Sequence, residues 1–360
     1  MNIVYVVEDF SENGGVERIV SQKANTLCCQ YHHKVNIVSI YQDYRPMLYP
    51  LEKSVEIIQL NVPFAQKGKS QIVTLFSRIS TLAIAARRLN QTIKALNPDI
   101  IFFTTTLGAI LLPLCKTNAK KIYESHLAKM FTPYHKLFFL TEKEANAIVC
   151  LTQGDAKEYN MAKKVEVIPN FIERHIYNVI DYSVKKAIAV GRLEYQKGFD
   201  ILINCWQTIA GKHPDWHLDI YGEGSLRDDL QSQINRLGLS NHITLCGRSN
   251  NIMEVYTRYS LHIMSSRYEG QPMTLIEAQS CGLPSVVTDF KYGASDIVKN
   301  NFNGLIVKQN DHKALADAIN TMMSSEALRR QYGTNALSVG KQYYKENVFN
   351  KWLSLISSLQ

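Results

Sequence analysis

The sequence predicts an α/β protein with two doubly wound parallel-sheet domains. Short β-branched runs alternate with longer helical patterns along most of the chain, which is typical of βαβ units. This alternation restarts near Lys186, after an irregular stretch from Pro169 to Ser183. A chain of 360 residues is also too long for one ordinary core. Two domains facing a cleft follow from these three observations.

The predicted strands fall into two series. The first comprises Ile3–Val7, Val35–Tyr41, Val55–Leu60, Ile100–Thr104, Lys121–Glu124, Ala147–Leu151 and Val165–Ile168. The second comprises Lys186–Val190, His217–Tyr221, Ile243–Leu245, Leu261–Met264, Ser285–Thr288 and Leu305–Val307. We therefore expect an N-terminal domain over residues 1–175 and a C-terminal domain over 176–342. The remaining residues, 343–360, are expected to form a helix that either packs back on the first domain or caps the second.

Composition limits the class of protein. The seven cysteines are scattered and never in CxxC spacing, which predicts neither a disulfide framework nor a zinc site and favours a reducing cytoplasm. The chain begins directly in a predicted strand, so no secretory leader is expected. The net charge is +8, and the segment from Ile57 to Pro98 contains six basic residues and no acidic one. Such a segment favours anionic partners.

In open parallel sheets, ligands bind beyond the carboxyl ends of the strands, so the loops there are candidate sites. Gly14 and Gly15 follow the first strand and open a helix, where backbone N–H groups can approach an anion. They equally suit an ordinary turn. His126 follows the strand ending at Glu124 and suits hydrogen bonding to a substrate hydroxyl or phosphate, although a lone histidine is often structural.

Two further loops in the second half carry stronger signals. Arg192 and Lys197 flank one loop at a strand end and suit a diphosphate, unless they form only a solvated pair. The segment from Glu269 to Glu277 contains a proline placed to begin a helix. Its helix-start amides and two carboxylates suit the phosphate and hydroxyl groups of a nucleotide sugar.

Five segments together resemble the retaining GT-B glycosyltransferases of family 4. These segments are the early glycine pair, GRLEYQKGFD, YGEGSLRDDL, SSRYEGQPMTLIEAQSCGLPSVVTD and NGLIV. The resemblance spans nearly the whole chain and is denser in its second half. It implies two Rossmann-like domains, with the nucleotide sugar mainly on the second and the acceptor mainly on the first. Bacterial enzymes of capsular polysaccharide and lipopolysaccharide biosynthesis are the relatives it suggests.

Transferred residue by residue, the resemblance implies roles for the candidate residues. Arg192 and Lys197 would hold the donor diphosphate, with Gly14 and Gly15 approaching it from the first domain. Glu277 would bind the ribose hydroxyls. The base is expected near a group of residues in two other loops, namely Gly222, Arg248 and Asn251.

The same resemblance places residues around the transferred sugar. His126 matches the family histidine near this sugar, and Glu269 is expected beside it. The residues after Glu269, expected around the sugar and the distal phosphate, are Gly270, Gln271, Pro272, Met273 and Thr274. The family usually has phenylalanine or leucine where Gln271 stands, so a polar group is expected to face the sugar here.

The predicted activity is that of a hexosyltransferase in the EC 2.4 class. It would move a hexose or N-acetylhexosamine from a nucleotide diphosphate sugar, with UDP preferred, to a glycan acceptor in cell-surface polysaccharide synthesis. No DxD triplet occurs, so we expect no metal or other cofactor, and fixed cations would stabilise the departing diphosphate. Family resemblance implies retention of anomeric configuration. No nucleic-acid partner is expected.

A basic amphipathic helix is predicted from Ile72 to Leu89. Its expected apolar face contains Leu75, Phe76, Ile79, Leu82, Ala83, Ala86 and Leu89, and its basic residues are Arg78, Arg87 and Arg88. One interpretation is peripheral contact with the anionic inner face of the cytoplasmic membrane, which suits a polyprenyl-diphosphate-linked acceptor. The other is that the apolar face packs on the first domain and the arginines are solvated.

Two other functions are compatible with doubly wound parallel sheets. An NAD-dependent oxidoreductase should show GxGxxG after the first strand, and the sequence around Gly14 and Gly15 lacks it. A non-catalytic carbohydrate-binding or scaffold protein remains the alternative, because a fold does not determine a function.

Overall fold

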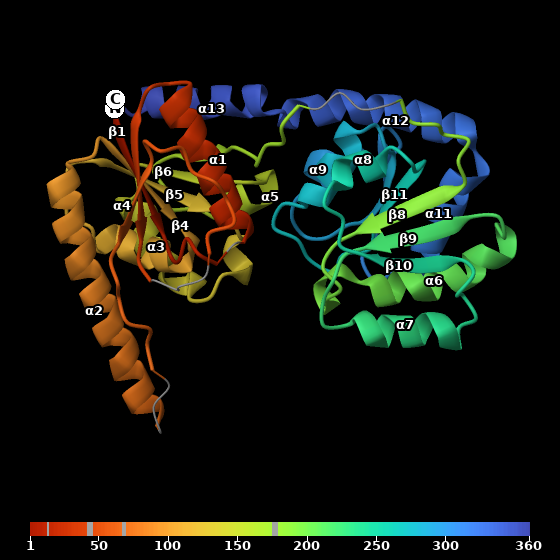
Figure 1. Cartoon of the computed structure of the whole chain (residues 1–360), viewed down its shortest axis with the longest axis horizontal. Coiled ribbons are helices and arrows are strands. Elements are labelled where there is room, and N and C mark those ends of the chain that lie inside the picture. The colour runs from red at the N-terminus through yellow and green to blue at the C-terminus, as the bar shows by residue number, and fades with distance from the viewer. Residues whose placement is uncertain (13, 42–45, 67–69, 175–178) are drawn as a thin grey trace. The chain divides into compact units, whose positions relative to one another are not determined.

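The computed structural model describes residues 1–12, 14–41, 46–66, 70–174 and 179–360 (Figure 1). The chain divides into two compact units. Unit 1 contains Met1–Leu151, Asp155–Ile168 and Ser357–Gln360, and unit 2 contains Thr152–Gly154 and Pro169–Ile356. Each unit contains one parallel sheet, which confirms the predicted fold class.

The sheet of unit 1 has seven strands in the order β3-β2-β1-β4-β5-β6-β7. The strands are β1 (Asn2–Val7), β2 (Lys34–Ser39), β3 (Glu56–Gln59), β4 (Ile100–Thr104), β5 (Lys120–Ser125), β6 (Ala147–Cys150) and β7 (Val165–Val167). All pairings are parallel, and β1 lies between β2 and β4. The order reverses there, so the carboxyl ends of β1 and β4 flank a topological switch point.

The helices of unit 1 cover both faces of this sheet. They are α1 (Gly15–Cys29), α2 (Gln71–Leu96), α3 (Thr105–Leu111) and α4 (Phe138–Glu144), while the short α5 (Gln153–Ala156) is divided between the units. Side chains alternate between the two faces along each strand. The Val4 face packs with α2, α3 and α4 in one hydrophobic core, and Tyr5 lies on the opposite face beneath Lys23 of α1.

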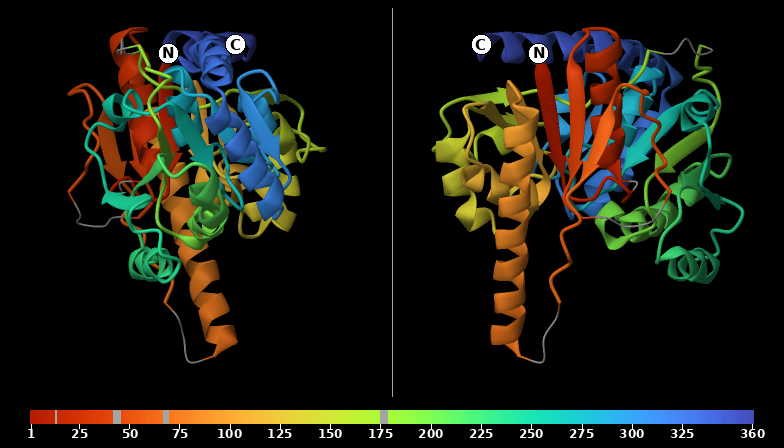
Figure 2. Two further views of the ribbon diagram at one scale, coloured as in Figure 1. Left: turned by 90° about the vertical axis from the view of Figure 1, so that its right-hand side faces the viewer. Right: turned by 60° about the vertical axis from the view of Figure 1, so that its left-hand side comes forward.

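Helix α2 packs on unit 1 over only part of its length. Its buried residues are Thr81, Ala85, Leu89 and Ile93, which recur every four residues and form a narrow stripe. No residue from Gln71 to Ser80 is buried, and Figure 2 shows this end of α2 extending beyond the sheet of unit 1. The predicted helix is therefore confirmed. Its predicted apolar face is confirmed only in part, because Leu89 is buried and Leu82 and Ala86 pack against the core, whereas Leu75, Phe76 and Ile79 are exposed.

The sheet of unit 2 has six parallel strands in the order β10-β9-β8-β11-β12-β13. They are β8 (Lys186–Val190), β9 (His217–Tyr221), β10 (Ile243–Gly247), β11 (Leu261–Met264), β12 (Ser285–Thr288) and β13 (Gly304–Val307). The helices are α6 (Phe199–Lys212), α7 (Arg227–Arg236), α8 (Ile252–Tyr256), α9 (Met273–Ser280), α10 (Ala294–Ile297), α11 (His312–Ser324) and α12 (Glu326–Gly340). The largest fully buried side chain, Trp206 of α6, lies in the core that joins α6, α7 and α11 to this sheet.

The final helix is α13 (Lys345–Ser358). Its buried residues are Val348, Phe349, Trp352, Leu355 and Ile356. Residues up to Ile356 group with unit 2, whereas Ser357–Gln360 group with unit 1. In the part of the chain that the structure describes, no helix is long and apolar enough to cross a membrane. Lys67 and Lys69 of the predicted basic segment lie outside the described residues.

Candidate functional site

A cluster of polar side chains in unit 2 lies where the strand order reverses. Strands β8 and β11 are neighbours, so their carboxyl ends meet at the topological switch point, where ligands bind in such sheets. The loop after β8 leads through a turn at Tyr195–Lys197 into α6, and the loop after β11 leads into α9. We call five residues from these loops the switch-point cluster: Arg192, Gln196, Lys197, Ser266 and Glu269.

The two loops approach each other closely at Gly198. Its φ of +64° lies in the left-handed region, and a Cβ atom there would collide with the carbonyl oxygen of Ser265. The hydroxyl of Ser265 also donates a 3.1 Å hydrogen bond to the carbonyl oxygen of Lys197. Glycine at position 198 is therefore required for the loop after β8 to lie against the loop after β11.

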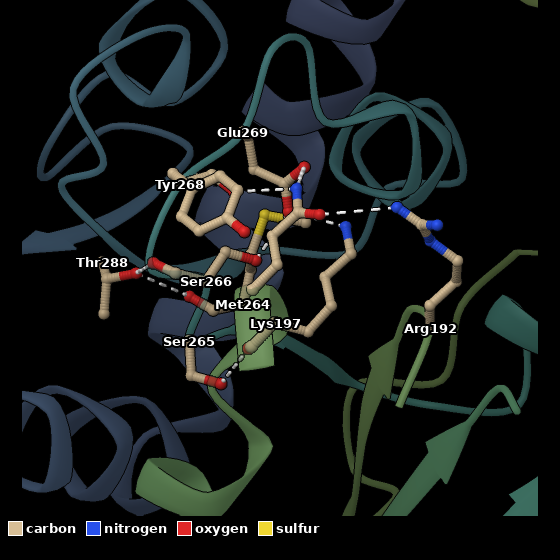
Figure 3. A network of polar contacts seen from close by, with 9 residues as sticks. Arg192, Lys197, Met264, Ser265, Ser266, Tyr268, Glu269 and Thr288 are labelled. Carbon is tan, nitrogen blue, oxygen red and sulfur yellow. Dashed lines mark hydrogen bonds and ion pairs between the residues drawn. The ribbon is translucent and has the colours of Figure 1, made fainter. Parts of the chain in front are cut away.

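Glu269 is the centre of the switch-point cluster. Its Oε1 lies 2.6 Å from Lys197 Nζ and accepts a 2.7 Å hydrogen bond from the Ser266 hydroxyl. Its Oε2 accepts a 3.3 Å bond from the Gln196 amide. The side chains of Lys197 and Glu269 are 13% and 6% exposed, and Figure 3 shows them pointing toward one another. The carboxylate is thus held by three partners from two loops.

Arg192 differs from Lys197 in being exposed. Among the described residues, its polar partner is Gln196, whose Oε1 lies 3.5 Å from Nη2 of Arg192. No described carboxylate forms an ion pair with it. The cluster therefore presents one cation that is neutralised by Glu269 and a second that can bind an anion without breaking an ion pair.

The helix after Glu269 begins as the sequence predicts. Pro272 precedes the first helical residue, Met273, and α9 continues to Ser280. Thr274 Oγ1 is buried and has no hydrogen-bond partner among the described residues, while its carbonyl oxygen accepts a bond from Tyr256. Glu277, in the second turn of α9, is partly buried. Gly270 is also partly buried.

Gln271, which we expected to face the sugar, has a backbone partner in the structure. Its Oε1 accepts a 2.7 Å hydrogen bond from the backbone N–H of Asn170. Asn170 belongs to the segment that follows the last strand of unit 1, and it is counted in unit 2. The Gln271 side chain therefore holds the backbone of Asn170 within unit 2.

The residues expected near the base lie at the ends of β9 and β10. Gly222 has a φ of +147°, and a Cβ atom there would collide with the carbonyl oxygen of Gly191, so the structure gives Gly222 a packing role. Arg248 is exposed. Asn251 caps α8, because its side-chain oxygen accepts a bond from the N–H of Glu254.

Sequence reasoning missed a supporting clamp around Arg267. Its guanidinium donates to both carboxylate oxygens of Asp200, at 2.9 and 2.7 Å, and lies 3.9 Å from the centre of the Tyr195 ring. Burial alone would raise the pKa of Asp200, but Arg267 lowers it. Arg267 lies within the segment SSRYEGQPMTLIEAQSCGLPSVVTD, but this segment does not reveal that its partner is Asp200, which lies 67 positions away.

In unit 1, the glycine pair follows β1. The N–H of Gly14 donates to the Glu17 carboxylate at 2.9 Å, which forms a capping arrangement at the start of α1. The Glu17 carboxylate therefore accepts from the Gly14 N–H group that we expected to face an anion. Burial raises the pKa of Glu17. Around Gly15, by contrast, a Cβ atom would meet no described atom within 4 Å, so this position has open space.

His126 follows β5 and contacts a buried ion pair, which we call the lysine-glutamate-histidine cluster (Lys23, Glu124, His126). Lys23 Nζ lies 2.6 Å from Glu124 Oε1, and His126 Nε2 lies 3.2 Å from Glu124 Oε2. Burial would raise the pKa of Glu124, but Lys23 and His126 outweigh burial and lower it. Burial lowers the pKa of Lys23 to about 8, which leaves this lysine charged at neutral pH.

The basic residues of α2 have different environments. Arg88 Nη1 donates to the carbonyl oxygens of Leu60 and Asn61, so it holds the loop after β3. Arg78 donates a 2.9 Å bond to the Tyr134 hydroxyl. Arg87 is exposed. Among the described residues, no group of three or more histidine, cysteine or acidic side chains is arranged to hold a metal ion.

Comparison with known proteins identifies the class. Residues 175–339 match the family model described as glycosyl transferases group 1. The amylovoran biosynthesis glycosyltransferase AmsD of Erwinia amylovora is 26% identical over 99% of both chains. A Campylobacter jejuni alpha-1,4-N-acetyl-D-galactosaminyltransferase, whose name gives an undecaprenol-linked diphosphate acceptor, is 24% identical over 100% of this chain and 99% of its own.

Solved structures agree on the fold. The lipopolysaccharide outer core galactosyltransferase WaaB has a TM-score of 0.83 at 17% identity over the full length of both chains. A TarM variant of S. aureus, solved with UDP, alpha-GlcNAc-glycerol and fondaparinux, has a TM-score of 0.77 at 16% identity over 99% of both chains. The chain therefore has the GT-B fold, its residues 175–339 are similar to the glycosyl transferases group 1 family, and the comparisons support glycosyltransferase activity.

Proposed function

We propose that this glycosyltransferase moves a hexose or N-acetylhexosamine from a UDP-sugar to a lipid-linked glycan in cell-surface polysaccharide biosynthesis. The reaction retains the anomeric configuration and needs no metal. The donor binds to unit 2 at the switch-point cluster, and the acceptor binds to unit 1.

The observation that carries this proposal is the pairing of Lys197 with Glu269 beside an exposed Arg192. Cleavage of a glycosyl-phosphate bond leaves negative charge on the diphosphate. Fixed cations and helix-start amides at that position stabilise this charge, and such stabilisation is commonly the largest contribution to catalysis. Arg192, Lys197 and the amides at the start of α9 supply these groups, while Glu269 can accept hydrogen bonds from sugar hydroxyls.

The names of similar proteins support the finer parts of the proposal. The TarM structure contains UDP, which favours UDP as the nucleotide here. AmsD is named for amylovoran biosynthesis, and the Campylobacter enzyme is named for an undecaprenol-linked acceptor. These names favour a surface glycan built on a polyprenyl diphosphate.

Metal independence and retention rest on different arguments. The sequence has no DxD triplet, so two cationic side chains are the proposed counter-charges of the diphosphate. Retention follows from the family 4 resemblance of the motif around Glu269. We propose same-face attack, in which the departing phosphate helps to remove the acceptor proton, and we assign no protein nucleophile.

The test of this proposal is turnover. UDP-sugars and GDP-mannose are first ranked by thermal shift, since a ligand at 100 times its dissociation constant stabilises a protein by about 2.7 kcal/mol. The best donor is then incubated with a polyprenyl-diphosphate-linked glycan, with and without EDTA, and UDP release is measured. Release that resists EDTA and disappears in folded Lys197→Ala and Glu269→Ala variants is expected. Tight donor binding without release for any acceptor would instead favour a carbohydrate-binding protein.

A lipid-linked acceptor fits the exposed surface of α2. Ile72 and Phe76 are each 67% exposed, and Val73, Leu75 and Ile79 are also exposed. The absence of acidic residues from Ile57 to Pro98 makes this end of α2 suitable for an anionic membrane.

A second apolar segment lies close to the same surface. The exposed large side chains between residues 130 and 140 are Met130, Tyr134, Leu137, Phe139 and Leu140. The hydrogen bond between Arg78 and Tyr134 joins this segment to α2. We define the membrane face as Ile72–Ile79 and the exposed Arg87 of α2, together with Met130–Leu140, and we propose that it contacts the inner leaflet of the cytoplasmic membrane.

Liposome sedimentation tests the membrane face. The Arg78→Glu/Arg87→Glu variant removes two basic residues, each worth about 1 kcal/mol near an anionic surface, so binding should fall at least about 30-fold. Arg88 is unsuitable because it holds the loop after β3. Lys212→Glu/Lys313→Glu makes the same charge change at exposed positions of unit 2 and should leave binding unchanged. Equal sedimentation of both variants with the wild type would remove the membrane face from the proposal.

A further inference from the structure

Gln196 connects Arg192 to Glu269 through its side-chain amide. It lies in the short turn before α6, next to Lys197. Its Nε2 donates to the carbonyl oxygen of Tyr268 at 2.9 Å and to Glu269 Oε2 at 3.3 Å. Its Oε1 accepts the 3.5 Å bond from Arg192 Nη2. One amide group thus contacts the exposed cation of the switch-point cluster and also the carboxylate that pairs with Lys197.

The loop after β11 determines the orientation of this amide. The carbonyl oxygen of Tyr268 can only accept a hydrogen bond, so the amide nitrogen of Gln196 has to face it. The amide oxygen then points the other way, toward Arg192. The backbone of Gln196 is held by the same loop, because its carbonyl oxygen accepts a 2.7 Å bond from the N–H of Arg267. Contacts of the backbone and of the side chain therefore fix the acceptor that Arg192 uses.

The acceptor offered to Arg192 is uncharged. A carboxylate at position 196 would form an ion pair with Arg192 and offset its charge, as Glu269 does for Lys197. An amide oxygen restrains the guanidinium and leaves its charge in place. Arg192 is exposed, and immobilising such a long side chain when a ligand binds lowers affinity by about two- to tenfold. A residue that restrains Arg192 beforehand removes part of this cost.

We propose that Gln196 is a positioning residue that holds Arg192 in place for the donor diphosphate and leaves its positive charge available. This inference rests on the proposed function, which assigns the diphosphate to the switch-point cluster. It goes further by naming a residue that acts through Arg192, and by assigning a reason for an amide at position 196. All the contacts that carry it lie within unit 2.

Calorimetric titration with UDP tests the chemistry required at position 196. Gln196→Met keeps the length of the side chain but removes the amide, so the Kd for UDP should rise about two- to tenfold. Gln196→Glu places a negative charge beside Arg192, so its Kd should rise further. The difference between the two variants should shrink at high salt, which screens exposed charges. A Kd equal to that of the wild type in either variant would overturn the inference.

A double-mutant cycle distinguishes positioning of Arg192 from a general structural role. If Gln196 acts through Arg192, then Gln196→Met should change the Kd for UDP by less than about twofold in an Arg192→Ala background. A change as large as the one in the wild-type background would mean that Gln196 acts independently of Arg192, which would overturn the inference.

Gln231→Met is the matched control for loss of an amide. Gln231 is exposed on α7, and its Nε2 donates a 3.1 Å bond to Asn235 Oδ1. This variant should bind UDP with the affinity of the wild type. A rise in its Kd as large as that of Gln196→Met would show that the effect is not specific to position 196.

Failure of this inference is distinguishable from failure of the proposed function. If Arg192→Ala leaves the Kd for UDP unchanged, the diphosphate does not contact Arg192, and the proposed donor site fails together with the role of Gln196. If Arg192→Ala weakens UDP binding but Gln196→Met does not, only the role of Gln196 is defeated.

Discussion

Lys197 Nζ lies 2.6 Å from Glu269 Oε1, so one of the two cations of the switch-point cluster is neutralised by a carboxylate of the same cluster. The pair joins the loop after β8 to the loop after β11. If the donor binds as we propose, Glu269 has two opposing effects on it: Glu269 weakens the attraction of Lys197 for phosphate, and it offers an acceptor to the sugar.

Glu269→Gln should separate these two effects. Removing the negative charge leaves Lys197 unpaired, so UDP should bind more tightly by about 1 kcal/mol, which is roughly fivefold. The charged acceptor for the sugar is lost, so kcat should fall at least about tenfold. Calorimetric titration with UDP and initial-rate kinetics with the UDP-sugar provide the two numbers. Weaker UDP binding in this variant would show that Glu269 does not oppose the diphosphate.

Arg267→Lys should destabilise unit 2 although it preserves the charge. Lysine cannot reproduce the two bonds to Asp200 together with the contact on the Tyr195 ring. We expect a loss of about 1 to 3 kcal/mol, seen as a lower Tm of the thermal transition that UDP raises. Arg258→Lys is the matched control, because Arg258 makes one exposed ion pair with Glu254 and should cost less than about 0.5 kcal/mol. Equal decreases in the Tm of both variants would show that the contacts of Arg267 with Asp200 and Tyr195 do not stabilise unit 2.

Stability should depend on pH through His262. Burial, together with the charge of Lys197, lowers the pKa of His262 to about 3. Because its unfolded pKa is near 6.5, the unfolded chain binds a proton that the folded chain does not over the interval between these values. The stability that neutral His262 contributes is therefore fully present above about pH 6.5. Below that value, the free energy of unfolding decreases by up to about 1.4 kcal/mol for each unit by which the pH is lowered.

The measurement for His262 compares wild type with His262→Asn. Urea unfolding between pH 5 and pH 6.5 avoids most carboxylate titration, and the wild type should lose more stability than the variant over this interval. Identical pH slopes would mean that His262 is not buried in its neutral form.

The sequence predicted the fold well because the signals are local. Every predicted strand is present, and each β-branched run, such as Ile100–Thr104, pairs in a parallel sheet. The loops at Arg192 and Glu269 come together because β8 and β11 are neighbours in the sheet, a pairing that the sequence analysis did not predict. Helix α9 begins next to Pro272 because proline suits the start of a helix.

The contacts that the sequence does not reveal join residues that are distant in the sequence. Lys23 pairs with Glu124 across 101 positions, and Gln271 bonds to Asn170 across the same separation, so neither contact is visible in a motif. The predicted apolar face of α2 is buried only in its second half, because helical spacing does not show where the supporting sheet ends. The buried residues of α2 begin at Thr81. Ile79 and Phe76, which lie nearer the start of the helix, are exposed.

Titration of UDP into wild type and into an Arg192→Ala/Lys197→Ala variant tests the central claim most directly. Each charged hydrogen bond to phosphate is worth about 1.5 to 3 kcal/mol, so the Kd of the folded variant should rise at least about 100-fold. A Kd within threefold of the wild-type value, in a variant with an unchanged Tm, would contradict a donor diphosphate held at the switch-point cluster.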